Sequence, residues 1–365
     1  MNDFEKYMLS CSEVPYLVIC GTGLAAKFVY EGLMKMGIKI NCFVEGGNET
    51  KRTYLGLPVN SENDIPNNSR CLICANPDYK IEKRLERCGI TDWKYIDPII
   101  CREYAHNNDY FKTIIRRLTD NKKRIDDLRE CLADEQSRHV LDVVLEHRIN
   151  PEIRKIYEIF TEQYFGNDLV KRVDGYDFVD CGAYNGDTLK RFIHQLENPI
   201  EYFKNHVYHA FEADRSNINQ IVEYCNKKKI ENVIVHQAVV WNGEEEEIFF
   251  EVDDSEISVG GKASDDKTER AIKVKAESLD IALAGQNVDM IIMDIEGAEP
   301  EALKGAKNII KEKAPILAIS VYHELNHIWE IPLQIKALNS DYKIYLRHHR
   351  WNMADTVCYA ISSQS

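Results

Sequence analysis

The stretch FVDCGAYNGDT, residues 178–188, decides the fold class of this chain. FVDC predicts a buried strand, and Asp187 followed by Thr188 predicts a helix that begins here, with Asp187 as its cap. Two glycines lie in the loop between them. Glycine lets the backbone pass close to a ligand at the carboxyl end of a strand, where open α/β sheets bind ligands. Taken alone, the pattern is also typical of a plain strand-to-helix connection.

The same alternation continues to the end of the chain. Helical stretches are predicted near Asp187, Asp214, Pro300 and Glu324, between the strand-like runs FVDC, VYHAFEA, VIVHQAVV, VDMIIMDIE, ILAISVY, YKIYLR and TVCYAI. Two further runs, EIFFEV and AIKVKA, flank a loop rich in glycine and serine and predict an inserted β-ribbon. This order of elements predicts an α/β domain over residues 166–365.

A second, smaller α/β domain is predicted over residues 1–100. Its strand-like runs YLVIC, IKINCFV, RCLICA and WKYID alternate with helical stretches. Residues 101–165 are highly charged and place apolar residues at helical spacing, so they predict a helical connector between the two domains.

Composition excludes several classes of protein. The formal net charge of -14 argues against a nucleic-acid partner, because phosphate binding needs clustered Lys and Arg. No apolar run approaches the roughly 20 residues that a membrane span requires. The first residues are acidic and do not have the pattern of a secretory signal peptide. The eleven cysteines lie mostly in apolar runs, and their spacing is not that of a disulfide-rich domain. We therefore expect a cytoplasmic protein.

Acidic residues follow the predicted strands of the C-terminal domain. Glu212, in FEAD at residues 211–214, is placed to accept hydrogen bonds from ribose hydroxyls, while Asp214 caps the next helix. Gln237 and Ala238 follow the next strand, where a nucleoside base would lie. The same residues are equally typical of the core of a sheet that binds no ligand.

Three carboxylates crowd the end of the run VDMIIMDIEGAE, residues 288–299. Repulsion between like charges means that such a group needs a cation, a role as a base, or exposure to water. The capping of a helix that starts near Pro300 explains Glu299 and Glu301. It does not explain Asp294 and Glu296.

The N-terminal domain carries a weaker glycine pattern. Gly21 and Gly23 lie between a strand and a helix, and Glu45 ends the next strand at the spacing of an acidic ribose ligand. This resembles the small Rossmann-like domains attached to sugar-modifying enzymes, which would imply a nucleotide sugar or dinucleotide as ligand. The alternative is a tight turn kept for packing, with no ligand.

Taken in order, these blocks resemble the FkbM-type methyltransferases. The resemblance runs from about residue 163 to 361 and rests on QYFGNDLV, VDCGAYNGDTL, FEAD, MDIEGAEPEALKGA, ISVYHELNHIWEIPLQIKAL and YKIYLRHHRWN. It implies a class I methyltransferase fold, a Rossmann-like, seven-stranded and mostly parallel sheet that binds S-adenosylmethionine across its strand ends. It also implies methyl transfer, usually to a hydroxyl oxygen.

The resemblance assigns roles residue by residue. It implies cofactor contacts by Asp180, Gly182, Ala183, Gly186, Asp187, Glu212, Gln237 and Ala238. We expect Asp294, Glu296 and His323 to help remove the proton from the acceptor. A histidine after an apolar strand is, however, often a packed or capping residue without a catalytic role. A divalent metal could serve instead of a base, and the sequence predicts no ligand set for it.

The expected function is O-methylation of a hydroxyl on a carbohydrate or similar polar metabolite, as in polysaccharide biosynthesis. The alternative is a nucleotide- or nucleotide-sugar-binding protein, or an oxidoreductase, that acts through Gly21, Gly23 and Glu45. The expected partners are a small-molecule or glycan acceptor and, at the N-terminal domain, a nucleotide sugar. The sequence leaves a homo-oligomer open.

Overall fold

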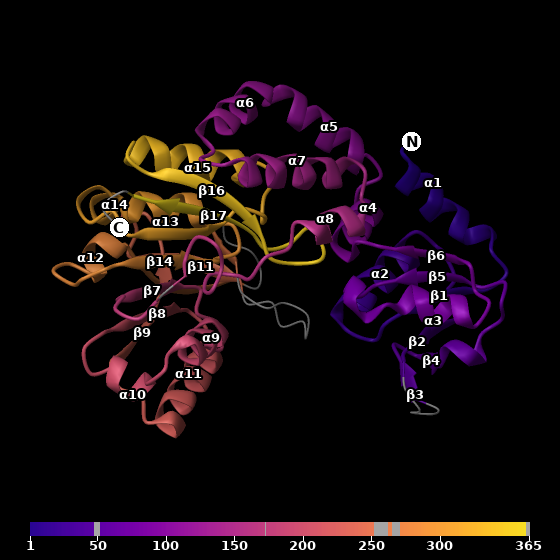
Figure 1. Ribbon diagram of the computed structural model, residues 1–365, viewed down its shortest axis with the longest axis horizontal. Helices are drawn as coiled ribbons and strands as arrows, with labels where there is room; N and C mark the ends of the chain where they lie inside the picture. Colours follow the sequence, from indigo (N-terminus) through magenta and orange to yellow (C-terminus); the bar gives the residue numbers. More distant parts are fainter. Residues whose placement is uncertain (47–51, 172, 252–261, 265–270, 363–365) are drawn as a thin grey trace. The chain divides into compact units, whose positions relative to one another are not determined.

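A computed structural model describes residues 1–46, 52–171, 173–251, 262–264 and 271–362 (Figure 1). The chain divides into two compact units. The first unit comprises residues 1–122, 139–160 and 350–354, and the second comprises 123–138, 161–349 and 355–365. Within the described residues, no helix is long and apolar enough to cross a membrane.

The first unit contains a six-stranded sheet in the order β3-β4-β2-β1-β5-β6. All neighbouring strands are parallel except β3 and β4, a short hairpin that the sequence did not predict. The strands are β1 (Leu17–Cys20), β2 (Cys42–Val44), β3 (Arg52–Tyr54), β4 (Leu57–Asn60), β5 (Arg70–Ile73) and β6 (Asp92–Tyr95). The helices that accompany them are α1 (Asp3–Ser10), η1 (Cys11–Glu13), α2 (Leu24–Lys35), η2 (Glu62–Asp64), η3 (Pro77–Tyr79), α3 (Ile81–Arg87) and α4 (Pro98–His106).

The region predicted as a connector is helical. It contains α5 (Tyr110–Asp120), α6 (Lys122–Cys131), α7 (Glu135–Ile149) and α8 (Ile153–Glu158). In α5, Tyr110, Phe111 and Ile114 are buried at helical spacing. The contacts assign α5 to the first unit and nearly all of α6 to the second, and α7 spans both. The division of the chain at residues 100 and 165 stays a prediction.

The second unit contains a seven-stranded sheet in the order β16-β17-β15-β14-β7-β8-β9. Only β17 runs antiparallel to its neighbours. This confirms the predicted mostly parallel sheet, with strands β7 (Phe178–Cys181), β8 (Tyr208–Glu212), β9 (Val233–Gln237), β14 (Met290–Met293), β15 (Ile316–Ser320), β16 (Lys343–His348) and β17 (Thr356–Ile361). The strands β7, β8, β14 and β15 are buried along their whole length, as expected where both faces of a parallel sheet are covered.

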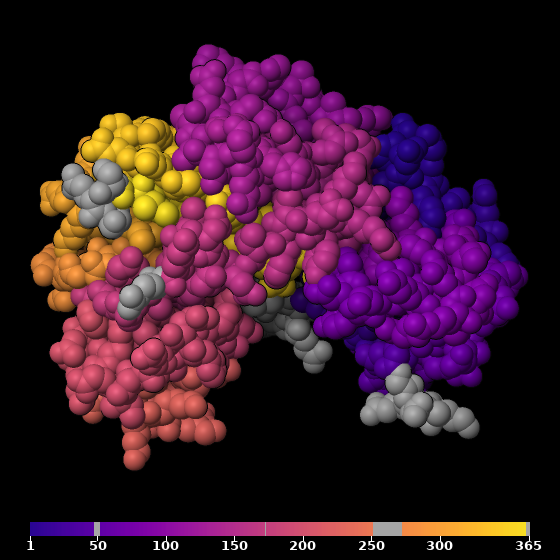
Figure 2. Space-filling view, viewed as in Figure 1, coloured from indigo at the N-terminus to yellow at the C-terminus, as the bar shows by residue number. Residues whose placement is uncertain are grey.

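Figure 1 shows α9 and α11 beside β7–β9, and α13 to α15 beside β14–β17. In the space-filling view, residues of α9 to α11 form a continuous pink to coral lobe (Figure 2). The helices of the second unit are α9 (Asp187–Gln195), α10 (Pro199–Tyr202), α11 (Arg215–Lys228), α12 (Leu279–Ala282), α13 (Glu299–Gly305), α14 (Lys307–Glu312) and α15 (His327–Leu338).

The predicted β-ribbon is a four-stranded sheet in the order β10-β13-β11-β12. It is formed by β10 (Val239–Val240), β11 (Glu247–Glu251), β12 (Lys262–Ser264) and β13 (Ala271–Glu277). Much of the loop rich in glycine and serine lies outside the described residues.

One helix start differs from its prediction. Gly186, not Asp187, is the N-cap of α9, and Asp187 is the first helical residue. Gly186 has a φ of 78°, which glycine adopts without strain, so the backbone enters the helix one residue early. Asp214 caps α11 as predicted, because its side chain accepts a hydrogen bond from the Asn217 amide.

A buried arginine connects the sheet of the second unit to two segments that precede it. The Arg347 side chain on β16 is 1% exposed, and its Nη2 lies 2.8 Å from Asp134 Oδ2 and 2.5 Å from Asp168 Oδ2. Its Nη1 also donates to the Ser137 hydroxyl at 3.0 Å. Bidentate contacts of this kind fix geometry as well as charge.

We expect Arg347→Met to lower the free energy of unfolding by about 1.5–3 kcal/mol, the cost of lost hydrogen bonds to charged groups. The loss stays below that of a fully buried pair because Asp134 and Asp168 are 33% and 45% exposed. Urea unfolding measures it. Lys123→Met, which breaks an exposed ion pair with Asp127, should cost less than about 0.5 kcal/mol. Equal losses in the two variants would contradict the structural role of Arg347.

Candidate functional site

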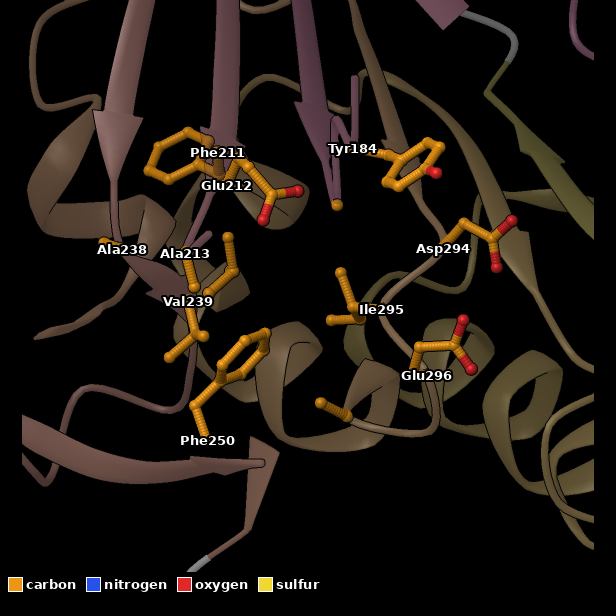
Figure 3. A pocket seen from close by; sticks show the side chains of 13 residues that line it. Tyr184, Phe211, Glu212, Ala213, Ala238, Val239, Phe250, Asp294, Ile295 and Glu296 are labelled. Atoms are coloured by element: carbon orange, nitrogen blue, oxygen red, sulfur yellow. The ribbon is translucent and has the colours of Figure 1, made fainter. Parts of the chain in front are cut away.

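A pocket opens at the carboxyl ends of the central strands of the second unit (Figure 3). About 550 Å³ of space free of protein atoms, part of it open to solvent, lies among its lining residues. It is lined by residues from the ends of four neighbouring strands and from the β-ribbon: Gly182, Tyr184, Phe211, Glu212, Ala213, Ala238, Val239, Val240, Phe250, Asp294, Ile295, Glu296 and Ala298. This is the edge where open α/β sheets bind ligands.

Strand register brings the predicted residues together. Cys181 at the end of β7 is paired with Met293 on one side and with Phe211 on the other. The residues that follow these three are therefore neighbours at one edge: Gly182, Asp294 and Glu212. Sequence alone located each at a strand end, and the parallel sheet makes them one site.

Gly182 allows the closest approach in the pocket. Its φ is 83°, and a Cβ atom there would lie 2.2 Å from the carbonyl oxygen of Asp294. The amides of Gly182 and Ala183 both donate to the Phe211 carbonyl at 3.0 Å. Any other residue at position 182 would push the end of β14 away from the β7 loop.

Glu212 lies at the end of β8 and points into the pocket beside Phe211 (Figure 3). It is 8% exposed, and its Oε1 accepts a hydrogen bond from the Asp214 amide at 2.7 Å. Burial raises the pKa of the Glu212 carboxyl, and the amide hydrogen bonds oppose this rise. The predicted arrangement, in which Glu212 faces the ligand while Asp214 caps the helix, is thus present.

Five of the predicted cofactor residues do not line the pocket: Asp180, Ala183, Gly186, Asp187 and Gln237. Asp180 is 2% exposed and accepts a hydrogen bond from the Tyr208 hydroxyl at 2.7 Å, and burial raises its pKa to about 7. Asp187 lies 3.6 Å from Arg191 in an ion pair, and Gln237 is exposed. The structure therefore makes Asp180 a support beneath the loop, and direct cofactor contact by these five residues stays a prediction.

Phe250 is a pocket residue that the sequence did not reveal. It lies on β11 of the ribbon, is 6% exposed, and borders the pocket beside Val239 (Figure 3). Val240 also lines the pocket. Its only sequence signal was an apolar residue in a predicted ribbon, which carries no information about a ligand.

At the other end of the pocket, the three predicted catalytic residues come together. The Nε2 atom of His323 lies 3.3 Å from Asp294 Oδ1 and 3.6 Å from Glu296 Oε2. The Tyr322 hydroxyl donates to Asp294 Oδ1 at 3.1 Å. Glu296 and Gly297 have φ values of 56° and 103°, and this turn folds the chain back after β14.

Glu299 belongs to the same cluster, and its prediction as a helix cap is wrong. Ala298 is the N-cap of α13, and the Glu299 carboxylate is 0% exposed. Its Oε1 accepts the Ile295 amide at 3.0 Å and lies 2.9 Å from His323 Nδ1. An acidic residue in the first helical turn is common for dipole reasons, so nothing in the sequence distinguished it.

The cluster favours positive charge at its centre. Burial opposes a charge on His323, but the carboxylates of Glu299, Asp294 and Glu296 outweigh it and raise the pKa of His323 to about 10. Burial raises the pKa of Asp294 to about 7, since neighbouring carboxylates add to the effect and His323 opposes it.

The second nucleotide site, predicted at Gly21, Gly23 and Glu45, has its acidic residue already paired within the chain. Gly21 has a φ of 123°, and Gly23 caps α2 with no other atom near its Cβ position. Glu45 accepts a hydrogen bond from the Thr22 hydroxyl at 2.8 Å and forms an ion pair with Arg52. The carboxylate predicted to hold a ribose is thus bound by its own chain, and a ligand here stays a prediction.

The sheet with its single antiparallel strand, and the pocket at its strand ends, define a methyltransferase fold that implies S-adenosylmethionine as methyl donor. Residues 180–349 match the family model described as Methyltransferase FkbM domain. This match confirms the resemblance that the sequence blocks predicted.

A solved structure shows the same fold over nearly the whole chain. A methyltransferase FkbM from Methylobacillus flagellatus KT is similar over 98% of this chain and 99% of its own, with 21% identity and a TM-score of 0.69. Aeropyrum pernix fibrillarin, solved with natively bound S-adenosyl-L-methionine, matches over 52% of this chain and 67% of its own, at 8% identity and a TM-score of 0.33. No curated protein matches the sequence.

Gly182→Ala should abolish donor binding, because the added Cβ would meet the Asp294 carbonyl oxygen at 2.2 Å. Gly285→Ala is the matched control: its φ is 78°, with nothing within 4 Å of the new Cβ, so it should cost only about 1–2 kcal/mol of backbone strain. Isothermal titration with S-adenosylmethionine and urea unfolding measure both variants. Equal donor affinities and equal unfolding free energies in the two variants would show that the close approach of Gly182 to Asp294 is unimportant.

Proposed function

We propose that this protein is an S-adenosylmethionine-dependent O-methyltransferase that acts on a hydroxyl group of a carbohydrate or similar polar metabolite. The observation that carries the proposal is the polarity of the pocket. Glu212 lies at one end of a single cavity, and Asp294 and Glu296 lie at the other (Figure 3). His323 contacts both of these carboxylates.

The first end fits the donor. The Glu212 carboxylate would accept hydrogen bonds from the two ribose hydroxyls. Ala238, Val239 and Phe250 offer an apolar surface for the flat adenine ring. The methionine part would then extend past Gly182, so that the sulfonium methyl group points toward Asp294.

The other end fits a hydroxyl acceptor. In the reaction, the acceptor oxygen bonds to the methyl carbon while the carbon–sulfur bond breaks, and its electron pair stays on sulfur to give S-adenosylhomocysteine. The acceptor proton leaves to a carboxylate of the cluster or to water. Positioning the oxygen in line with the methyl group provides much of the rate, and proton transfer adds about 10²–10⁴-fold.

The carboxylates also favour a class of acceptor. Asp294 and Glu296 accept hydrogen bonds from hydroxyls and repel phosphate or carboxylate groups near the reacting atom. This supports a polyhydroxylated, locally uncharged acceptor such as a sugar ring, and hence a role in polysaccharide biosynthesis. A cytoplasmic location, a nucleotide-sugar ligand and a homo-oligomer remain predictions. Because Glu45 is hydrogen-bonded to Thr22 and paired with Arg52, we do not propose a nucleotide-binding function for the N-terminal domain.

Glu212→Ala should weaken S-adenosylmethionine binding by about 1.5–3 kcal/mol, because charged hydrogen bonds to the ribose are lost. Isothermal titration measures the change in Kd, roughly 10- to 150-fold. Glu223→Ala, on the exposed side of α11, should bind like the parent. If Glu212→Ala also binds like the parent, the ribose assignment is wrong.

Methyl transfer is tested by release of S-adenosylhomocysteine in the presence of a panel of mono- and oligosaccharides, with amino acids and peptides as the competing panel. We expect product with sugars only. With an accepted sugar, Asp294→Asn should lower turnover by roughly 10²–10⁴-fold while donor binding stays close to that of the parent. Methylation confined to the amino-acid panel would refute the hydroxyl acceptor.

A further inference from the structure

His323 is a buried imidazole whose ring nitrogens face carboxylates from three residues. Its side chain is 8% exposed, and among the described residues neither ring nitrogen makes a well-aligned hydrogen bond. Nε2 nevertheless lies between two carboxylates, at 3.3 Å from Asp294 Oδ1 and 3.6 Å from Glu296 Oε2. Nε2 thus faces two carboxylate oxygens without a well-aligned hydrogen bond, an arrangement that a cation placed between these three atoms would satisfy.

The spacing of these atoms fits the coordination shell of a metal ion. Two ligands about 2.1 Å from the same ion are roughly 3.0–3.4 Å apart in octahedral or tetrahedral geometry. The 3.3 Å between Nε2 and Asp294 Oδ1 falls in this range. Glu296 is 43% exposed, so its side chain is free to turn toward an ion. Asp294, Glu299 and His323 each offer an atom within 4.8 Å of the others.

The surrounding contacts are those that orient metal ligands. A metal-bound histidine almost always donates its other ring N–H to a carboxylate. Here the other nitrogen, Nδ1, lies 2.9 Å from Glu299 Oε1, and the Ile295 amide holds the same oxygen at 3.0 Å. The Tyr322 hydroxyl in turn donates to Asp294 at 3.1 Å.

We propose that His323 Nε2 and the carboxylates of Asp294 and Glu296 bind one divalent cation, with Glu299 orienting the imidazole ring. A set of one nitrogen and two carboxylate ligands suits an ion such as Mn²⁺. The exposed side of the cluster leaves positions for the acceptor hydroxyl, whose pKa an ion lowers. In this respect the inference rests on the proposed function.

Direct binding of Mn²⁺ to the full chain, after treatment with a chelator, tests the site by electron paramagnetic resonance of the free ion. We expect one ion per chain. Asp294→Asn and His323→Ala should lose it, and Glu299→Gln should weaken it by about 10- to 100-fold, as for residues that orient a ligand. Glu312→Gln, on the exposed end of α14, should bind Mn²⁺ like the parent.

The site is refuted if the parent binds no Mn²⁺ up to about 1 mM, the weak end of specific cation sites. It is also refuted if Asp294→Asn and His323→Ala bind like the parent. Should these buried changes prevent folding, as judged by circular dichroism, the more exposed Glu296→Gln decides: weaker binding supports the site, and unchanged binding overturns it.

Donor binding and methyl transfer to sugars, measured in parallel, separate this inference from the proposed function. A chain that methylates sugars but binds no Mn²⁺ loses only the metal site. A chain that binds Mn²⁺ through these residues but methylates no sugar keeps the site and loses the proposed acceptor.

Discussion

The close approach of the β7 loop to the end of β14 is the constraint on which the whole site depends. It exists because position 182 is a glycine with a φ of 83°, and a Cβ there would lie 2.2 Å from the Asp294 carbonyl oxygen. The register that pairs Cys181 with both Met293 and Phe211 then fixes Glu212 on one side and Asp294 on the other. One missing side chain therefore sets the separation between Glu212 and Asp294 at the two ends of the pocket.

A second constraint is the charge buried behind Asp294. A fully buried carboxylate such as Glu299 is costly unless it is paired and hydrogen-bonded. The Ile295 amide and His323 provide these contacts, at 3.0 Å and 2.9 Å. Because Glu299 contacts Nδ1 of the imidazole, the other nitrogen, Nε2, is directed toward Asp294 and Glu296. The buried charge of Glu299 therefore fixes the orientation of the imidazole beside the two carboxylates that line the pocket.

Much of this could be predicted from the sequence, because parallel strands align their carboxyl ends at one edge. The strand runs, the mostly parallel sheet and the positions of Glu212 and Asp294 follow from apolar periodicity and from the residues that end each run. Phe250 could not be predicted, since its place depends on how a ribbon inserted between β9 and β14 folds back. Glu299 could not either, because an acidic residue at a helix start has an ordinary explanation. Asp180 was placed in the pocket because it precedes the glycine loop, yet its side chain is buried and bound to Tyr208.

The two ends of the pocket are built from different kinds of contact, and this bears on how the site works. The Glu212 end consists of backbone, small or apolar surfaces and one carboxylate, all on strands or the loops that directly follow them. The Asp294 end consists of charged side chains on the turn after β14 and on the segment after β15. Under the proposed function, the Glu212 end would hold the methyl group in one direction, which is what an in-line displacement needs. Glu296, 43% exposed at the Asp294 end, would then be the polar group able to adapt to the molecule that receives the methyl group.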